Sequence, residues 1–241
     1  MFSPALLQRI VLPICLALAS CASPGQPPMP ILSKVTRAES IQIAESYLRH
    51  RWVPSRQNIL HGNDARGVRV DTPDIDYQPG GRAIPGWWVP GAVNEGVPYQ
   101  WGGFSTLAEF DQGIAQGLAA GDVYTDAKRA ALDDAVSPQA VGIDCSGFVS
   151  RCWKLPRAYS TRELPGLCDP IPWEDLKAGD ILNTHNAHCL LVSHWDDAQR
   201  ERVFVYETGC PPTWKVAAHA IDVAWLKSLG YTAWRYRGIV N

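Results

Sequence analysis

The first clear periodic pattern of the chain lies in residues 37–51. Apolar side chains recur there at Ile41, Ala44, Tyr47 and Leu48, which is the spacing of one face of a helix. Polar and charged residues fill the positions between them. We therefore predict an amphipathic helix over this segment.

Residues 58–91 are dense in Gly, Pro and Asp and contain few periodic runs. Such composition predicts irregular chain that follows the surface. Asp71, Asp74 and Asp76 fall within it, and three neighbouring carboxylates can bind calcium. In a segment rich in turn residues, carboxylates more commonly cap turns, and we assign these three that role.

Helical patterns return in the middle of the chain. Residues 104–142 predict several short helices, of which 127–135 is richest in Ala, Lys, Arg, Leu and Asp. Residues 145–154 predict a buried helix, because Phe148 and Trp153 are among the apolar side chains that it offers to a core.

The residue pattern in the last part of the chain predicts β-strands. Residues 187–194 and 202–208 are apolar or alternating, with β-branched and aromatic side chains, and the segment between them is polar. This pattern predicts an antiparallel hairpin, and residues 232–240 predict a final strand. We find no internal repeat. The pattern predicts one α+β domain.

The N-terminal residues have the pattern of a targeting segment. Arg9 precedes a short apolar run that is too short to span a bilayer and is typical of a signal peptide. The run ends in Leu-Ala-Ser-Cys21, which resembles the bacterial lipobox, and Ala22 after it is typical of outer-membrane sorting. An ordinary signal peptide is the alternative. We expect a signal peptide (1–20), a Pro-rich tether (21–34) and a folded domain (35–241).

Lipid on Cys21 would anchor the domain to the membrane of the cell envelope, on the periplasmic side. The domain itself has the composition of a globular protein, with 46% hydrophobic and 19% charged residues. A formal net charge of -2 and the lack of a basic stripe argue against a nucleic-acid partner. Ten Trp residues predict either ordinary packing or an aromatic-lined groove for an extended substrate.

The chain has seven cysteines. Cys15 would leave with the signal peptide and Cys21 would carry lipid, so an odd number remains and at least one thiol must be free. If the free thiol is Cys145, the other four form disulfides or stay as buried thiols, and the sequence leaves both readings open. These four are Cys152, Cys168, Cys189 and Cys210.

Cys145 stands where a helix is predicted to begin. Asp144 is a good N-cap, so Cys145 falls in the first turn, at the positive end of the helix dipole. Backbone N–H groups in the first turn have no partner within the helix. Both features favour the thiolate, and the free N–H groups can stabilise an oxyanion. We therefore take Cys145 as a candidate nucleophile.

A thiolate nucleophile needs a base or imidazolium partner, which is usually a histidine, and His188 opens a predicted strand. His185 is the rival, but it lies in a turn before that strand. If the hairpin turn is centred near Ala198 and Gln199, Glu207 lies on the same face as His188 and can orient its ring, provided no bulge intervenes. A carboxylate in an apolar strand is costly to bury unless it is paired.

These residues fall within four motifs whose order resembles the NlpC/P60 family of papain-like cysteine peptidases. They are Val-Pro-Tyr-Gln-Trp-Gly-Gly (97–103), Asp-Cys-Ser-Gly-Phe-Val (144–149), Leu-Lys-Ala-Gly-Asp-Ile-Leu (176–182) and His-Cys-Leu-Leu-Val (188–192). The resemblance covers roughly residues 96–209.

The resemblance implies a papain-like fold, in which N-terminal helices pack on an antiparallel β-sheet. It implies Cys145 as nucleophile and His188 as base, with no cofactor or metal. It implies that peptidoglycan stem peptides are the substrate, and that Tyr99 is a polar group near the oxyanion or substrate. We place Trp101, Asp144 and Ser146 in the same group of substrate or oxyanion residues.

The chain departs from the family pattern in two places. About forty residues (104–142) separate the aromatic-Gly motif from the Cys motif, which almost adjoin in most members, and this insertion could build a wall over the cleft. An N-terminal extension (35–95) precedes both motifs. Glu207 takes the third catalytic position, which is more commonly His in that family and makes the site more like the related CHAP amidases.

Three other readings stay open. A papain-like acyltransferase or hydrolase acting on lipid would usually have His before Cys, the reverse of the order here. A metal-dependent hydrolase would use His185, His188, Cys189 and His194, but strand alternation is expected to point Cys189 away from His188. A cell-wall-binding lipoprotein without activity would not need the Cys, His and acid set.

Overall fold

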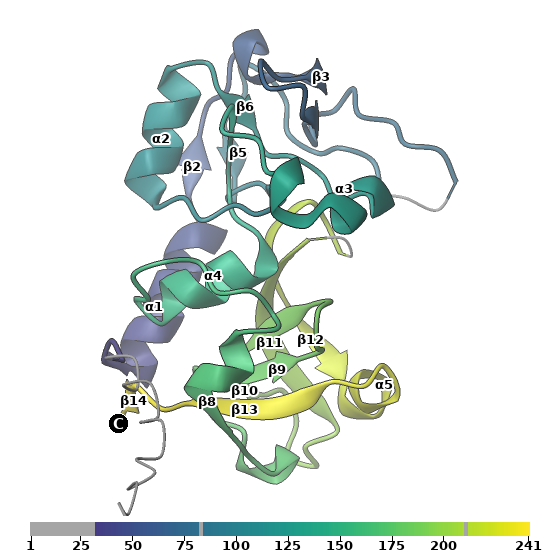
Figure 1. The fold of residues 1–241 in the computed structure, drawn as a ribbon. Coiled ribbons are helices and arrows are strands. Elements are labelled where there is room, and N and C mark those ends of the chain that lie inside the picture. Colours follow the sequence, from purple (N-terminus) through teal and green to yellow (C-terminus); the bar gives the residue numbers. More distant parts are fainter. Residues whose placement is uncertain (1–31, 82–83, 210–211) are drawn as a thin grey trace, which may run out of the picture. The chain divides into compact units, whose positions relative to one another are not determined.

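The computed structural model contains a six-stranded antiparallel sheet, seen in the lower half of Figure 1. The structure describes residues 32–81, 84–209 and 212–241. The strand order is β12-β11-β10-β9-β13-β8. The strands are β8 (Cys168–Pro170), β9 (Ile181–Asn183), β10 (Cys189–Trp195), β11 (Arg202–Gly209), β12 (Lys215–Asp222) and β13 (Thr232–Tyr236).

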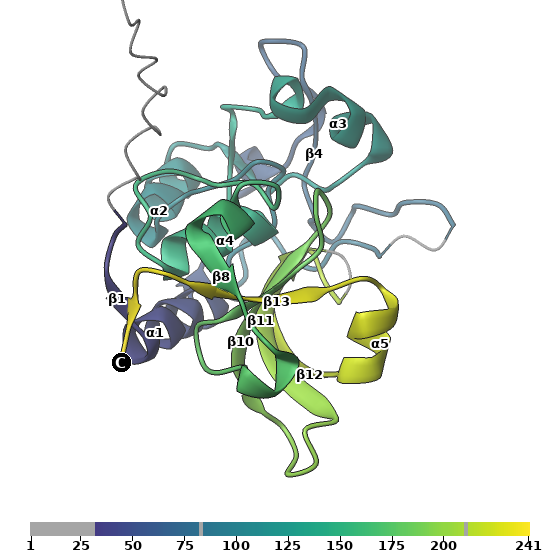
Figure 2. The ribbon, with the colours of Figure 1, turned by 60° about the horizontal axis from the view of Figure 1, so that its bottom comes forward.

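Helices cover both faces of this sheet, which confirms the predicted α+β class (Figures 1 and 2). On one face α1 (Arg37–Leu48) and α4 (Cys145–Cys152) pack together, and Tyr47 meets Phe148 edge-on with 5.9 Å between ring centroids. On the other face α5 (Val223–Ser228) contributes Leu226 to a second, smaller apolar cluster. Residues of the N-terminal extension thus belong to the main core.

Shorter elements surround this core. Four two-stranded pairs join β1 (Val35–Thr36) to β14 (Ile239–Val240), β2 (Arg51–Trp52) to β5 (Asn94–Glu95), β3 (His61–Asn63) to β4 (Arg69–Asp71), and β6 (Ala119–Ala120) to β7 (Ala140–Val141). The insertion adds α2 (Leu107–Ala115) and α3 (Asp126–Ala131). Single 3₁₀ turns lie at Arg56–Asn58, Leu132–Ala135, Leu164–Leu167 and Trp173–Asp175.

The helix predictions are confirmed with shorter ends. Thr36 and Glu39 form a reciprocal capping box that begins α1, and the helix ends at Leu48 because Arg51 already pairs with Glu95 in a strand. The helix predicted over 145–154 is α4, and the pieces predicted between 104 and 142 are α2, α3 and a 3₁₀ turn.

The irregular structure predicted over 58–91 is also confirmed for its described residues, 58–81 and 84–91, apart from the short β3–β4 pair. Its carboxylates cap and pair locally, as expected. Asp74 accepts hydrogen bonds from the Thr72 hydroxyl at 2.7 Å and the Asp76 amide at 3.0 Å, and Asp71 pairs with Arg69.

Two strand predictions need correction. The last strand, predicted over 232–240, breaks after Tyr236, and Ile239–Val240 instead pairs in parallel with β1. Strand β10 begins at Cys189, so His188 precedes the strand rather than opening it. Its backbone is held in a turn, where the His188 N–H donates to the Thr184 hydroxyl at 3.0 Å.

The β10–β11 hairpin contains the bulge that could have separated His188 from Glu207. Near the turn His194 pairs with Phe204, whereas beyond the bulge Val192 pairs with Val205, a shift of one residue. The shifted register places Glu207 opposite Leu190, two residues along the chain from His188. Although a bulge is present, His188 and Glu207 still meet, with 2.6 Å between Nε2 and a carboxylate oxygen.

The described cysteines are Cys145, Cys152, Cys168 and Cys189, and all four are buried free thiols. Of the four cysteines that the sequence left as either disulfides or buried thiols, Cys152, Cys168 and Cys189 are therefore buried thiols. Cys210 lies outside the described residues. The signal peptide, Cys21 and the tether up to residue 31 also lie outside them. In the part that is described, no helix is both long and apolar enough to cross a membrane.

Candidate active site

Cys145 is the first residue of α4, where the sequence predicted it. Asp144 caps the helix, and its carboxylate accepts hydrogen bonds from the Gly147 amide at 2.5 Å and the Ser146 hydroxyl at 3.0 Å. Gly103, from the aromatic-Gly motif, lies against this turn so closely that a Cβ on Gly147 would stand 2.1 Å from its carbonyl oxygen. Two of the motifs therefore depend on each other sterically.

The imidazole of His188 contacts Cys145 and is held from its far side. Its Nε2 lies 2.6 Å from a carboxylate oxygen of Glu207, which is buried on β11. That bond occupies Nε2, so Nδ1 is the ring nitrogen left for the hydrogen bond with Cys145. The three residues form a Cys–His–Glu arrangement of the kind that activates a thiol.

The second oxygen of Glu207 has its own partner, which the sequence analysis did not identify. His219 of β12 places its Nε2 2.5 Å from that oxygen. In the β11–β12 register Glu207 pairs with Ala217, so His219 stands two residues away on the same face. The sequence does show a histidine among alanines in an apolar strand. This pattern points to Glu207 as its partner only when β12 is known to pair with β11.

Charges across this chain of contacts support a thiolate–imidazolium pair. Hydrogen bonding by Cys189 and the charge of His188 outweigh burial and hold the pKa of Cys145 well below its usual value. Burial alone would lower the pKa of His188, but the Cys145 thiolate and Glu207 raise it. Burial would likewise raise the pKa of Glu207, whereas His188 and His219 keep it lowered.

Cys189 also takes part in the site, contrary to the expected direction of its side chain. Its buried thiol hydrogen-bonds to Cys145, so Cys189 and His188 both reach the same sulfur. The alternation argument failed because His188 lies just outside β10. His194 lies at the far end of that strand and stacks on Phe204. Within residues 32–81, 84–209 and 212–241, no three His, Cys, Asp or Glu residues are grouped to hold a metal ion.

A cavity of about 340 Å³ opens over Cys145. All six cavity-facing residues named from the sequence line it, namely Tyr99, Trp101, Asp144, Cys145, Ser146 and His188, whereas Glu207 lies behind the imidazole. Tyr99 is 5% exposed and packs against Trp214. The indole N–H of Trp101 donates to the Leu132 carbonyl oxygen at 3.1 Å, so its contribution to the cavity is the ring face.

The insertion forms one wall of this cavity. Tyr124, Arg129, Leu132, Asp133 and Val136 all line it, and they surround α3 and the 3₁₀ turn that follows. The sequence predicted a wall over the cleft but not its residues, because their placement depends on Trp101 and on how the insertion folds back.

Comparisons with known proteins add no assignment: no family model, no curated protein and no solved structure matches the chain significantly. The reading of the site therefore depends on its geometry and on the motif resemblance.

His219 should act as a positioning residue for Glu207. We expect His219→Ala to lower kcat by about tenfold with little change in KM, because one charge-assisted hydrogen bond to the buried carboxylate is lost. The pKa of Glu207 should rise, and the acid limb of the kcat profile should move to higher pH. His219→Gln retains an N–H near the Nε2 position and should recover most of the rate.

The matched control for this experiment is His194→Gln, which changes another histidine of the same sheet, one that hydrogen-bonds to its neighbour Ser193 and does not line the cavity. Its pH–rate profile should overlay that of the wild type. If His219→Ala also leaves the acid limb in place, His219 has no positioning role.

Proposed function

We propose that this protein is a cysteine hydrolase that cleaves peptide or amide bonds in peptidoglycan stem peptides. The observation that carries the proposal is the Cys145–His188–Glu207 arrangement at the floor of an accessible cavity. The peptidoglycan substrate class comes from the motif resemblance and from the expected lipid anchor. A papain-like fold belongs to the same proposal.

In the first half-reaction the Cys145 thiolate attacks the carbonyl carbon of the scissile amide. The negative charge then moves to the carbonyl oxygen, close to the positive end of the α4 dipole and to the Cys145 N–H, while the Gly147 N–H is already bonded to Asp144. The imidazolium of His188 donates its Nδ1 proton to the leaving nitrogen, the C–N bond breaks, and a thioester with an amine product results.

In the second half-reaction neutral His188 removes a proton from water, which attacks the thioester carbonyl. The C–S bond breaks, the carboxylic acid product leaves, and the thiolate–imidazolium pair returns. Glu207 keeps Nε2 protonated throughout and stabilises the charged ring. The buried position of Glu207 makes this interaction stronger than it would be in water.

The proposal is tested by incubating the full-length chain with purified peptidoglycan and identifying the released fragments by mass spectrometry. We expect new peptide fragments whose ends define the bond cut. A thiol-alkylating reagent should abolish their release, whereas a chelator should leave it unchanged. Fragments released equally by the Cys145→Ala variant would contradict a cysteine mechanism.

The anchor is tested separately. We expect Cys21→Ala to leave the precursor unprocessed or to release the protein from the membrane fraction, because the diacylated cysteine supplies the anchor. The measurement is fractionation with immunodetection and intact mass. Ser20→Thr, which retains a small residue before the cysteine, serves as the control. Unchanged anchoring of Cys21→Ala would refute lipidation at this residue.

A further inference from the structure

Two arginines face the cavity that holds Cys145. Arg129 comes from α3 in the insertion, and Arg162 comes from the loop that follows α4. They lie more than thirty residues apart in the sequence, yet both line the same space of about 340 Å³. Arg129 is half-buried and Arg162 is exposed. Neither guanidinium forms a hydrogen bond or an ion pair with any other described residue.

The acidic groups nearby do not neutralise them. Glu163, next to Arg162, accepts hydrogen bonds from Arg157 and Ser160 instead. Asp133 lines the cavity four residues after Arg129, a helical spacing that often pairs charges, but no ion pair forms between them.

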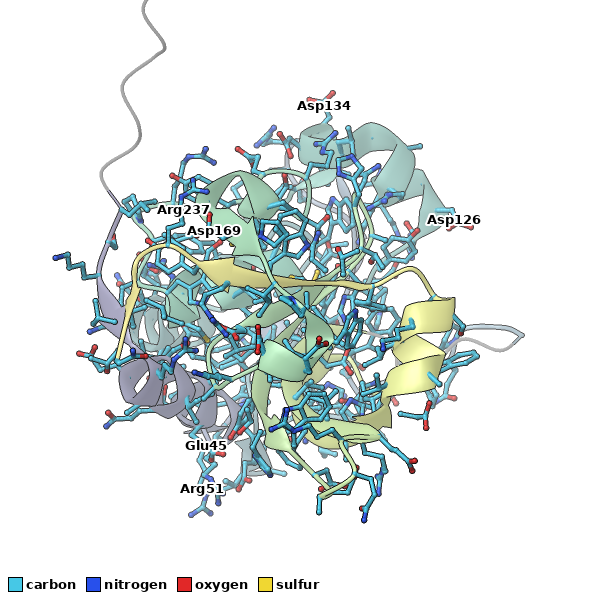
Figure 3. All side chains as sticks on the ribbon, turned by 90° about the horizontal axis from the view of Figure 1, so that it is seen from below. Glu45, Arg51, Asp126, Asp134, Asp169 and Arg237 are labelled. Atoms are coloured by element: carbon cyan, nitrogen blue, oxygen red, sulfur yellow. The ribbon has the colours of Figure 1, made fainter. Side chains whose placement is uncertain are left out.

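Three further carboxylates belong to the same region. Asp144 caps α4, and burial together with the charge of Cys145 raises its pKa to about 7, so its charge is partly absent at neutral pH. Asp134 and Asp126 project from the outer surface of the insertion in Figure 3, and neither lines the cavity. Among the described residues, the cavity lining therefore carries two cationic groups against one exposed carboxylate, that of Asp133.

The wall that carries Arg129 is fixed in place. Lys128 beside it forms a buried ion pair with Asp122 and donates to the Val123 carbonyl oxygen at 3.0 Å. The indole of Trp101 holds the Leu132 carbonyl from the cavity side. The backbone that carries Arg129 is therefore already ordered, so ligand binding costs the freedom of the side chain alone.

We propose that Arg129 and Arg162 bind a carboxylate of the substrate, next to the amide that Cys145 attacks. Guanidinium groups suit this ligand because each offers parallel N–H donors to two oxygens. The inference rests on the proposed function and deepens it, since it selects acyl or peptide substrates with a free carboxylate. The rings of Trp101, Tyr124 and Trp214 supply apolar surface for the rest of such a substrate.

The test compares two probes that alkylate Cys145 by the same displacement of iodide. Iodoacetate carries a carboxylate, whereas iodoacetamide is neutral and nearly equal in size. In the full-length protein at low salt, alkylation rates are followed by mass spectrometry of the peptide that contains Cys145. The rate with iodoacetate is divided by the rate with iodoacetamide. This ratio is then divided by the same ratio for a small free thiol, which gives a normalised ratio.

We expect the normalised ratio to exceed one in the wild type, because the arginines attract the iodoacetate anion. It should fall about threefold in Arg129→Gln or Arg162→Gln, and about tenfold in the double variant. Arg66→Gln is the matched control, because it removes the same charge from an exposed turn outside the cavity. Asp133→Asn should raise the ratio.

The outcomes separate this inference from the function on which it rests. If Cys145 reacts rapidly with both probes but the ratio does not change in the double variant, the arginines bind no carboxylate and the inference fails. If Cys145 reacts slowly with both probes, the activated thiolate is absent and the proposed function fails. A confirming second measurement is a KM that rises in the double variant for a free carboxylate substrate but not for its amide.

Discussion

Replacing Cys145 by Ala or Ser should lower the rate of hydrolysis by several orders of magnitude while the protein stays folded. The thiolate, His188 and Glu207 act as one unit, and loss of the nucleophile from such a unit removes nearly all of its contribution. A serine hydroxyl at this position has a far higher pKa than the thiol, so the imidazole cannot hold it as an anion. The measurement is fragment release from peptidoglycan with circular dichroism on each variant.

Cys152 provides the matched control in the same helix. Burial raises the pKa of its thiol well above the usual value, and Cys152 does not line the cavity. Cys152→Ala should therefore keep the rate while losing some stability through the small cavity it leaves. Near pH 7, iodoacetamide should modify Cys145 and spare Cys152. Turnover by Cys145→Ala at the wild-type rate would end the cysteine mechanism.

Local sequence patterns predicted the residues whose roles depend on their own neighbours. Asp144 and Cys145 are adjacent, so the sequence of these two residues alone predicts an N-cap followed by a thiol in the first helical turn. The hairpin was predictable because a polar segment separates two apolar runs. The approach of His188 to Glu207 could be stated only as a condition, since it depended on a bulge that no residue pattern marked.

What the sequence could not supply depends on contacts between distant segments. His219 becomes a partner of Glu207 only because β12 adds to the sheet beside β11. Arg129 reaches the cavity only because the insertion folds back, with Trp101 bonded to Leu132 and Lys128 paired with Asp122. The prediction that Cys189 points away from His188 was wrong for a related reason. Strand alternation applies only within a strand, and β10 begins at Cys189, after His188.

The geometry around Glu207 predicts a specific pH effect. Its two oxygens each accept from a different imidazole, that of His188 at 2.6 Å and that of His219 at 2.5 Å. A glutamine offers one oxygen and one NH₂ group, so it can accept from only one of the two ring N–H groups. The other ring then faces an NH₂ donor and must present an unprotonated nitrogen to keep its hydrogen bond. Glu207→Gln therefore removes the negative charge and also requires a change of tautomer at one of the two histidines.

We expect Glu207→Gln to lower the rate by about 10²-fold, and Glu207→Ala to be worse because the ring also loses its orienting partner. The Glu207 charge raises the pKa of His188, so the imidazolium persists to higher pH in the wild type. Without that charge the pKa of His188 falls, the proton is lost earlier as pH rises, and the alkaline limb of the rate profile moves to lower pH.

The test is a pH–rate profile for the wild type and both variants, with thermal melts to confirm folding. Glu201→Gln, an exposed acid at the hairpin turn, is the control and should match the wild type. Full activity of Glu207→Ala across the alkaline range would show that Glu207 is not the third catalytic residue.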